Sequence, residues 1–306
     1  MPAPRDRQPG AASAPGCLGI DVGGTKVAFR AETGDGRIEE SSFTWGPHRD
    51  AARDLADLAS HLEEFPGTAD VRAVGVAMPA TVGPDERITA WPSRPAWTGL
   101  ALGPALRALF PGARVAWADD GDLGALAEAD AANCPNLLYV GVGTGIGGGL
   151  VLDGALCPGP ARGSFEIGHL VIDRDGPECV CGRRGCLQAT ASGPATLAHA
   201  TALRGTPVTF GELRRGLSDQ RPWAVTALDR TARALATAIT GVGELVHPER
   251  AVLGGGFAGG VPALLDALAP HLADLSRPGH PTPALAPARL GGLSSLRGAV
   301  LLARQL

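Results

Sequence analysis

Apolar runs alternate along the chain with segments that repeat leucine and alanine at helical spacing. The runs predict strands at residues 17–20, 27–29, 38–43, 71–78, 114–117, 137–142, 150–152 and 250–254. The helical spacing predicts helices at residues 50–65, 100–110, 119–132, 192–203, 222–246, 260–274 and 295–305. Two segments rich in proline, 81–98 and 278–287, are expected to be loops. Strands that alternate with helices predict an α/β fold.

Three glycine-rich turns follow apolar strands, at residues 21–26, 143–149 and 254–256. Phosphate groups need backbone N–H donors at close approach, and glycine permits this because it has no Cβ. Plain hairpin turns in a glycine-rich protein are the alternative for any one of them. The first two turns each join two strands and lie about 120 residues apart, which is a weak internal duplication. It predicts two related lobes that face each other.

The turns do not match the common nucleotide motifs. None has the sequence G-x-x-x-x-G-K-[ST]. The spacing from Gly143 to Gly148 is like G-x-G-x-x-G, but a strand follows it where a dinucleotide site has a helix. Asp21 and Thr144 lie beside two of the turns, and these residue types suit Mg²⁺ and a phosphate oxygen, respectively. Together these features favour phosphate binding.

A second candidate site combines one histidine with three clustered cysteines: His169, Cys179, Cys181 and Cys186. Three thiolates and one imidazole complete the tetrahedral shell of Zn²⁺ and leave no open position, so the predicted site is structural. Without a secretory signal, clustered cysteines indicate a metal site and not disulfides. Free reduced thiols in a loop are the alternative.

Acidic residues mark two further positions. Asp119 and Asp120 follow a strand and open a helix, where a carboxylate is able to act as general base for a hydroxyl nucleophile. Plain helix capping is the alternative. Glu166 precedes the expected zinc ligand His169 by three residues, so metal binding would fix its backbone and aim its side chain. A solvated glutamate is the alternative there.

Composition limits the functional classes. The chain has 306 residues, of which 44% are hydrophobic and 19% charged, with a net charge of −4, so we expect a globular protein of two domains. No basic face indicates nucleic acid, and no apolar run approaches a membrane span. Residues 1–16 lack the apolar core of a signal peptide and predict a loose tail on a cytoplasmic protein.

From Leu18 onward the chain resembles the ROK family (repressor, open reading frame, kinase). The segments that carry the resemblance are DVGGTK, GVGTGIGGG, EIGH and CVCGRRGCLQATASG, at residues 21–26, 141–149, 166–169 and 179–193. The resemblance implies a two-lobed, actin-like ATPase fold of the sugar kinase and ribonuclease H type, with a cleft between its lobes. It implies a small lobe at 17–118, a large lobe with the zinc loop at 119–291, and a helix at 292–306 that packs back on the small lobe.

The resemblance also implies an ATP-dependent sugar kinase that uses Mg²⁺ and a structural Zn²⁺ and forms dimers or tetramers. Asp120 takes the place of the catalytic base, which accepts a proton from the attacking primary hydroxyl. Glu166 and His169 match residues that bind sugar hydroxyls. The residues implied to bind ATP and its phosphates are Asp21, Gly23, Gly24, Thr25, Lys26, Gly143, Thr144, Gly145, Gly254, Gly255 and Gly256, the last three near the adenosine.

Four positions expected to line the sugar pocket depart from the family pattern. The family has Asn for Asp119, Glu for Gln188, Gly for Ala80 and Asn near Ser93. An ionised Asp only accepts hydrogen bonds, so Asp119 needs a donor-rich or cationic partner such as an amino group. We therefore hypothesise that the substrate is an aminosugar or a C7-cyclitol of secondary metabolism, such as antibiotic biosynthesis.

Three alternatives remain. An ordinary glucokinase or N-acylhexosamine kinase would tolerate these changes in its pocket. A sugar-sensing repressor would carry a DNA-binding segment of some tens of residues before the first strand, where this chain has about 16. A catalytically inactive sugar-binding protein would have no need for both Asp120 and the glycine turns.

Overall fold

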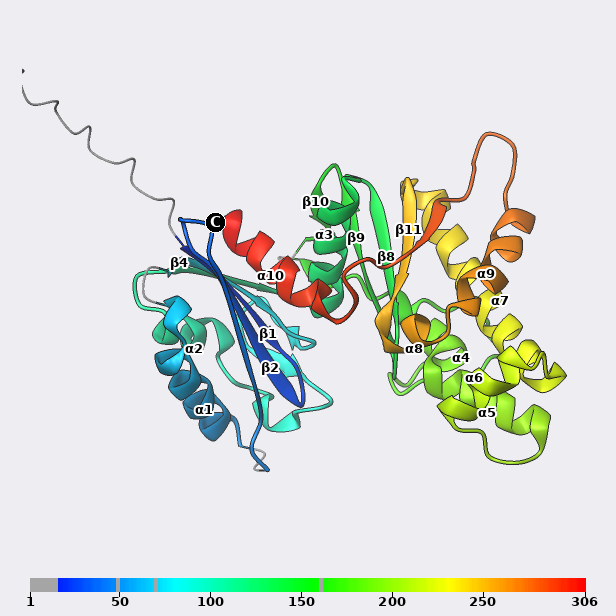
Figure 1. The fold of residues 1–306 in the computed structure, drawn as a ribbon, viewed down its shortest axis with the longest axis horizontal. Helices are drawn as coiled ribbons and strands as arrows, with labels where there is room; N and C mark the ends of the chain where they lie inside the picture. The colour runs from blue at the N-terminus through cyan, green and yellow to red at the C-terminus, as the bar shows by residue number, and fades with distance from the viewer. Residues whose placement is uncertain (1–15, 48–49, 69–70, 160–161) are drawn as a thin grey trace, which may run out of the picture.

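The computed structural model describes residues 16–47, 50–68, 71–159 and 162–306. Within this part, two five-stranded sheets lie side by side, each with helices on both faces, and form two lobes (Figure 1). The expected N-terminal tail, residues 1–16, lies outside the described residues except for its last residue.

The first sheet has the strand order β3-β2-β1-β4-β7. Its strands are β1 (Gly16–Val22), β2 (Lys26–Glu32), β3 (Ile38–Thr44), β4 (Val71–Ala77) and β7 (Arg114–Ala118). β1 pairs antiparallel with β2 and parallel with β4, so Ile20 lies opposite both Phe29 and Val76. Helices α1 (Ala51–Glu64) and α2 (Leu102–Leu109) cover one face of this sheet (Figure 1). The apolar side chains between them form the core of the first lobe.

The second sheet has the strand order β10-β9-β8-β11-β12. Its strands are β8 (Leu137–Val142), β9 (Ile146–Leu152), β10 (Ala155–Cys157), β11 (Arg250–Gly254) and β12 (Ala284–Pro287). Helix α3 (Asp120–Ala132) packs on one face. The helices gathered on the other face are α4 (Leu187–Ala191), α5 (Gly193–Arg204), α6 (Phe210–Ser218), α7 (Pro222–Val246), α8 (Gly255–Gly260) and α9 (Ala263–Asp274) (Figure 1). None of the described helices is both long and apolar enough to cross a membrane.

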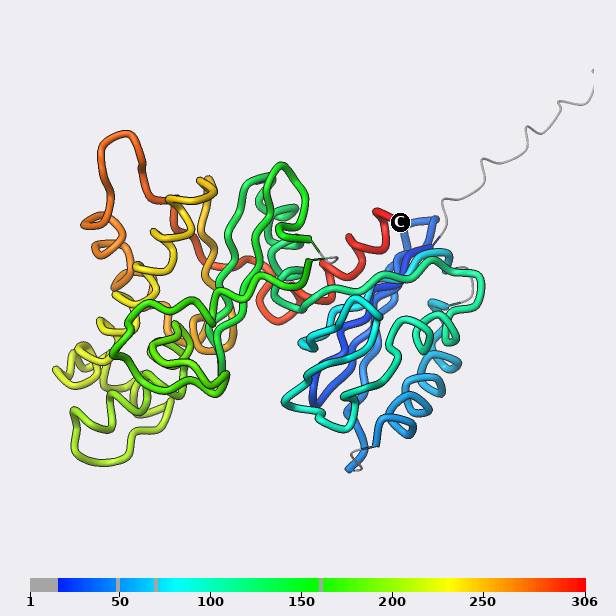
Figure 2. The backbone as a smooth tube through the Cα atoms, turned by 180° about the vertical axis from the view of Figure 1, so that it is seen from behind, coloured from blue at the N-terminus to red at the C-terminus, as the bar shows by residue number. Residues whose placement is uncertain are grey.

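Helix α10 (Ser294–Arg304) comes last in the described chain and joins the two lobes. It packs against β1 and β4 of the first sheet and against α3 of the second lobe, and Figure 2 shows it between them. Two glycines allow this close packing. A Cβ on Gly75 would lie 2.0 Å from the carbonyl oxygen of Ala299, and one on Gly298 would lie 1.9 Å from that of Leu123. Side chains at either position would force the helix away from its partner.

The structure differs from the expected elements mainly within the segments expected to be loops. Residues 81–98 contain a two-stranded ribbon of β5 (Thr81–Val82) and β6 (Ile88–Ala90), followed by the short 3₁₀ helix η2 (Pro95–Trp97). The expected loop at 278–287 contributes the edge strand β12. The elements β10, α4 and α6 were not expected, and α8 begins within the third glycine turn. Short elements carry too few residues for a clear period, and glycine and proline hide them further.

Candidate active site

A pocket of about 470 Å³ lies between the lobes and brings together residues from both. The first lobe contributes Pro79, Thr81, Ala90 and Pro92. The second contributes the start of α3, the turn between β8 and β9, and the segment around His169. The residues expected to bind substrate or phosphate that line it are Asp119, Asp120, Gly143, Thr144, Gly145, Glu166, His169, Gln188 and Gly255. Half of the residues predicted to bind substrate or nucleotide therefore meet in one cavity.

The two neighbouring acids are held at the first turn of α3. Asp119 is the N-cap, and its Oδ1 accepts a hydrogen bond from the N–H of Gly121 at 2.9 Å. Asp120 is the first residue of the helix. Glycine brings this turn close to β9, since a Cβ on Gly121 would lie 2.5 Å from the carbonyl oxygen of Gly148. Gly148, in the second glycine-rich turn, thus helps to place the two acids of α3 in addition to shaping its own loop.

The acidic groups of the cleft raise one another's pKa values. Burial raises the pKa of Asp119 to about 8, and the charge of Asp120 adds to this shift. Burial likewise raises the pKa of Asp120, although hydrogen bonds from Gly121 and Asp119 oppose the change. Burial and the charge of Asp120 raise the pKa of Asp21 to about 7, while Lys26 lowers it. Such a cluster favours a bound cation, which would relieve the repulsion.

A further buried acid, Asp122, lies behind this pair. It is 4% exposed, and its Oδ1 accepts a hydrogen bond from the N–H of Phe165 at 3.3 Å. Burial raises its pKa to about 7, and the N–H of Phe165 opposes that shift. Asp122 therefore connects α3 to the segment that carries Glu166. One signal in the sequence could have pointed to Asp122, namely its position two residues after Asp120.

The first glycine turn lies at the end of β1 and does not line this pocket. Gly23, Gly24, Thr25 and Lys26 are absent from the lining, as are Gly254 and Gly256 of the third turn. Asp21, at the start of the first turn, is absent from the lining as well. The charge of Asp120 nevertheless adds to the raised pKa of Asp21, so the two carboxyl groups interact where the lobes meet.

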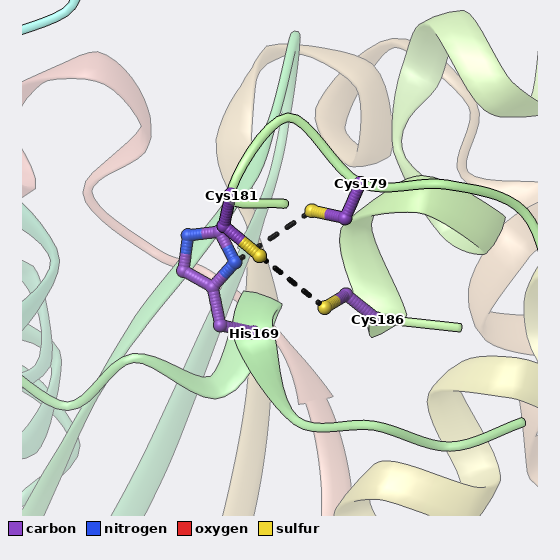
Figure 3. A group of neighbouring side chains, drawn as sticks. All are labelled: His169, Cys179, Cys181 and Cys186. Carbon is purple, nitrogen blue, oxygen red and sulfur yellow. Dashed lines mark hydrogen bonds between the residues drawn. The ribbon is translucent and has the colours of Figure 1, made fainter. Parts of the chain in front are cut away.

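The four predicted zinc ligands lie together (Figure 3). Their donor atoms are all within 4.8 Å of one another, with His169 Nδ1 3.7 Å from Cys179 Sγ and Cys181 Sγ 3.7 Å from Cys186 Sγ. The loop closes because Gly182 and Gly185 adopt φ values of +86° and +74°. Since Nδ1 lies on the side of the cluster, the Nε2 atom of His169 is the ring nitrogen left for the pocket.

Gln188 lines the pocket, but both ends of its amide have protein partners. Its Nε2 donates a hydrogen bond to Cys179 Sγ at 3.5 Å, and its Oε1 accepts one from the N–H of Ile146 at 3.4 Å. The side chain thus connects the cysteine cluster to the turn between β8 and β9.

Two positions expected near the sugar lie outside the lining. Ala80 packs against the core of the first lobe. Ser93 lies against the first glycine turn, where a Cβ on Gly24 would come within 2.4 Å of its Oγ. Their neighbours Pro79 and Pro92 line the pocket instead. Tyr139 and Ser295 also line it and were not expected, since Tyr139 sits within an apolar strand and Ser295 arrives on α10 from the far end of the described chain.

Comparison with known proteins gives consistent matches. The profile of the ROK family matches residues 17–306. A kanosamine kinase from Amycolatopsis mediterranei is 62% identical over 94% of this chain and 95% of its own length. The crystal structure of a ROK hexokinase from Thermus thermophilus has a TM-score of 0.81 and 31% identity, covering 95% of this chain and 98% of that one. A ROK glucokinase from Streptomyces griseus, solved with glucose and AMPPNP, has a TM-score of 0.77 at 24% identity, covering 95% and 100%. These likenesses confirm the predicted two-lobed, actin-like ATPase fold.

Proposed function

The chain belongs to the ROK family and is an ATP-dependent sugar kinase, and on this premise we propose that its acceptor is an aminosugar such as kanosamine. The observation that carries the proposal is the acidic cluster at the start of α3. Asp119, Asp120 and Glu166 face one cavity, and two of them have raised pKa values. The 62% identity to a kanosamine kinase supports the same acceptor class.

Asp119 is the residue that we assign to the amino group. Its carboxyl group lines the pocket, where one oxygen caps α3 and the side chain also hydrogen-bonds with Asp120, a contact that an ammonium group would replace. An ammonium group beside it favours the ionised form and brings its raised pKa back down. A neutral hydroxyl at the same place would leave the repulsion with Asp120 uncompensated. The proposed preference for an aminosugar over a neutral sugar therefore comes from the charge of the amino group.

Asp120 is the proposed general base. It lines the pocket beside Asp119, so it is placed to accept the proton of the attacking hydroxyl as the γ-phosphoryl group transfers. Its raised pKa brings its proton affinity closer to that of a base acting near neutral pH. Glu166, whose Oε1 accepts a hydrogen bond from Ser164 Oγ at 2.6 Å, and His169 would hold the sugar hydroxyls.

The reaction uses ATP and a divalent metal ion. Such an ion would supply positive charge to the phosphates during transfer. The residues present suit Mg²⁺, since Asp21, near the end of β1, offers carboxylate oxygens of the kind that this ion prefers. We propose that the turns at 23–26, 143–145 and 254–256 bind the nucleotide, with Thr144 donating to a phosphate.

The cysteine cluster is proposed to hold a structural Zn²⁺. The donor set of three sulfurs and one imidazole nitrogen fits tetrahedral zinc and leaves no position for substrate. The metal would fix the position of His169 and, through the short 3₁₀ helix η4 (Ile167–His169), that of Glu166. Gln188 would carry the same constraint to Ile146.

We further propose that residues 17–118 and 119–291 act as two lobes, with 292–306 packing back on the first. The two sheets and the contacts of α10 support this division. Assembly into dimers or tetramers and the absence of a nucleic-acid partner stay predictions. The C7-cyclitol stays the second candidate acceptor, because an amino-substituted carbocycle would present the same cation to Asp119.

An acceptor panel tests the proposal. Purified protein with Mg²⁺ and ATP is assayed for ADP release against kanosamine, glucosamine, glucose, N-acetylmannosamine and a C7-cyclitol. We expect the highest kcat/KM for an aminosugar, with glucose lower by about one to two orders of magnitude. Equal or higher kcat/KM for glucose would refute the assignment of the acceptor, and no ADP release with any acceptor would refute the kinase itself.

A further inference from the structure

The first glycine turn is anchored by three successive carbonyl oxygens. That of Gly23 accepts a hydrogen bond from Trp45 Nε1 at 2.8 Å, and that of Gly24 accepts one from Arg94 Nε at 3.1 Å. That of Thr25 accepts one from the backbone N–H of Trp45 at 3.0 Å. In a planar trans peptide the carbonyl and the following N–H point in opposite directions. Holding these carbonyls inside the first lobe therefore turns the N–H groups of Gly24 and Thr25 outward.

These outward N–H groups have no hydrogen-bond acceptor within the described part of the chain. Among the described residues, neither Gly24 nor Thr25 donates its N–H to a backbone or side-chain acceptor. Gly23, by contrast, donates its N–H to the carbonyl oxygen of Lys26 at 2.9 Å and closes the turn. Successive free N–H groups in a glycine turn form a concave site that suits an anion. Arg94 decides the orientation of one of these peptides, the one between Gly24 and Thr25.

Arg94 is itself held on several sides. It is 7% exposed, forms a salt bridge with the fully buried Asp54, and lies with its guanidinium carbon 4.5 Å from the centre of the Trp45 ring. Trp97 Nε1 donates a hydrogen bond to the same Asp54 oxygen at 2.6 Å. A buried ion pair is weak evidence for stability, because desolvation offsets much of the attraction. The ion pair with Asp54 therefore matters more for holding Arg94 against the first glycine turn than for the stability of the fold.

The segment that carries Arg94 also reaches the acceptor side. Pro92 lines the pocket beside the acids, and Ser93 lies against Gly24. Residues 92–94 thus lie between the sugar side of the cavity and the first glycine turn. Arg94 is the residue of this segment that bonds to the glycine turn, through the carbonyl oxygen of Gly24.

We propose that Arg94 is a positioning residue for the nucleotide. Through its hydrogen bond to the Gly24 carbonyl, it orients the N–H of Thr25 toward a phosphate group of ATP. The inference rests on the proposed function, since it takes the first glycine turn to bind phosphate. Arg94 does not itself touch the substrate or the reacting atoms.

Arg94→Lys is the first test. Lysine keeps a positive charge beside Asp54 but lacks the planar Nε donor to Gly24. We expect the KM for ATP to rise about 3- to 10-fold, the worth of one hydrogen bond, while the KM for the aminosugar changes less than about twofold. Arg107→Lys is the matched control, because Arg107 forms an exposed salt bridge with Glu86 in the same lobe, and its kinetics should stay unchanged.

A second variant guards against misfolding of the first. Trp45→Phe keeps an aromatic ring but removes the Nε1 donor to the Gly23 carbonyl, so it frees the neighbouring peptide and should raise the KM for ATP in the same way. An unchanged KM for ATP in both folded variants would overturn the proposal, as would equal changes in both KM values. The wild-type rate with the aminosugar is measured first. Its absence would count against the proposed function, whereas a normal wild-type rate with unaffected variants would count against the role of Arg94 alone.

Discussion

The carboxyl group of Asp21 lies close enough to Asp120 for the charge of Asp120 to raise its pKa, although burial contributes more. Asp21 is the next-to-last residue of β1 in the first lobe, and Asp120 begins α3 in the second. The two lobes therefore bring two carboxyl groups together where they meet. Without a cation this arrangement is unfavourable, and the chemistry proposed above supplies cations as Mg²⁺ and as an ammonium group.

Asp120→Asn should abolish most of the transfer. Asparagine keeps the size of the side chain but does not accept the proton, and general base catalysis contributes about 10²- to 10⁴-fold. We expect kcat to fall by that factor while the KM for ATP stays within about threefold. Steady-state ADP release measures both. A variant that keeps more than a tenth of the wild-type kcat would exclude Asp120 as the base.

Asp119→Asn should change the acceptor preference and leave the chemistry in place. Asparagine still caps α3 but offers no charge to an ammonium group. We expect kcat/KM for the aminosugar to fall about 10- to 100-fold and that for glucose to fall less or rise. The ratio of the two values is the informative quantity. If it does not move, the amino group is recognised elsewhere.

The stability of the protein without ligands should decrease as pH rises from about 4 to about 8. Asp119 has a pKa of about 8, and Asp21 and Asp122 have pKa values of about 7, all above the unfolded value of about 3.9. The folded state binds more protons than the unfolded state between these limits, so stability present at low pH is lost as pH rises through the folded pKa values. Differential scanning fluorimetry should show a falling Tm and a shallower slope for Asp119→Asn. Parallel slopes would contradict the shift at Asp119.

Removal of the metal should loosen the sugar side of the pocket before it unfolds the lobe. We expect one zinc per chain by elemental analysis, and Cys181→Ser, at an exposed ligand, should lower the zinc content and the Tm. The KM for the acceptor should rise more than that for ATP, because His169 and Glu166 depend on the loop. Cys134→Ser, at a cysteine outside the cluster, serves as control. Wild-type protein that contains no zinc would contradict the assignment.

Gly298→Ala tests the packing of α10. The added methyl group would lie 1.9 Å from the carbonyl oxygen of Leu123, so the helix must shift from α3. Overpacking of this kind costs about 1–3 kcal/mol, or several degrees in Tm. Gly292→Ala is the matched control, because nothing lies within 4 Å of its Cβ position. Equal Tm values for the two variants would show that the helix adjusts freely.

Residues that the sequence groups in one motif lie together in the structure. Residues 143–147 of the second glycine turn and the acids at 119–120 line one pocket, and the four predicted zinc ligands form one cluster, while their roles stay predictions. Tyr139 and Ser295 escaped prediction for a physical reason, since they reach the cavity through the pairing of β8 and the return of α10. Contacts made between distant segments leave no local pattern.

The helices and strands, too, were predicted well where a local pattern was long and missed where it was short. The longest period gave the best bounds, as α7 covers the expected 222–246. The ribbon of β5 and β6 was hidden because Pro84, Pro92 and Pro95 dominate its segment, and α8 because it begins in a run of glycines. Gln188 shows a related limit. Its predicted place in the pocket followed from the motif, whereas its bonds to Cys179 and Ile146 depend on how two loops meet.

The place of α10 in the chain has a consequence for synthesis in the cell. The strand β7 ends at residue 118 and α10 begins at residue 294, so the face of the first sheet that α10 covers, formed by β1, β4 and β7, is synthesised 176 residues before its cover. At 5–20 residues per second this interval lasts roughly 9–35 s. During that time a nascent chain exposes an apolar sheet surface to chaperones and proteases. The yield of active kinase during growth will therefore depend on how the cell protects this intermediate.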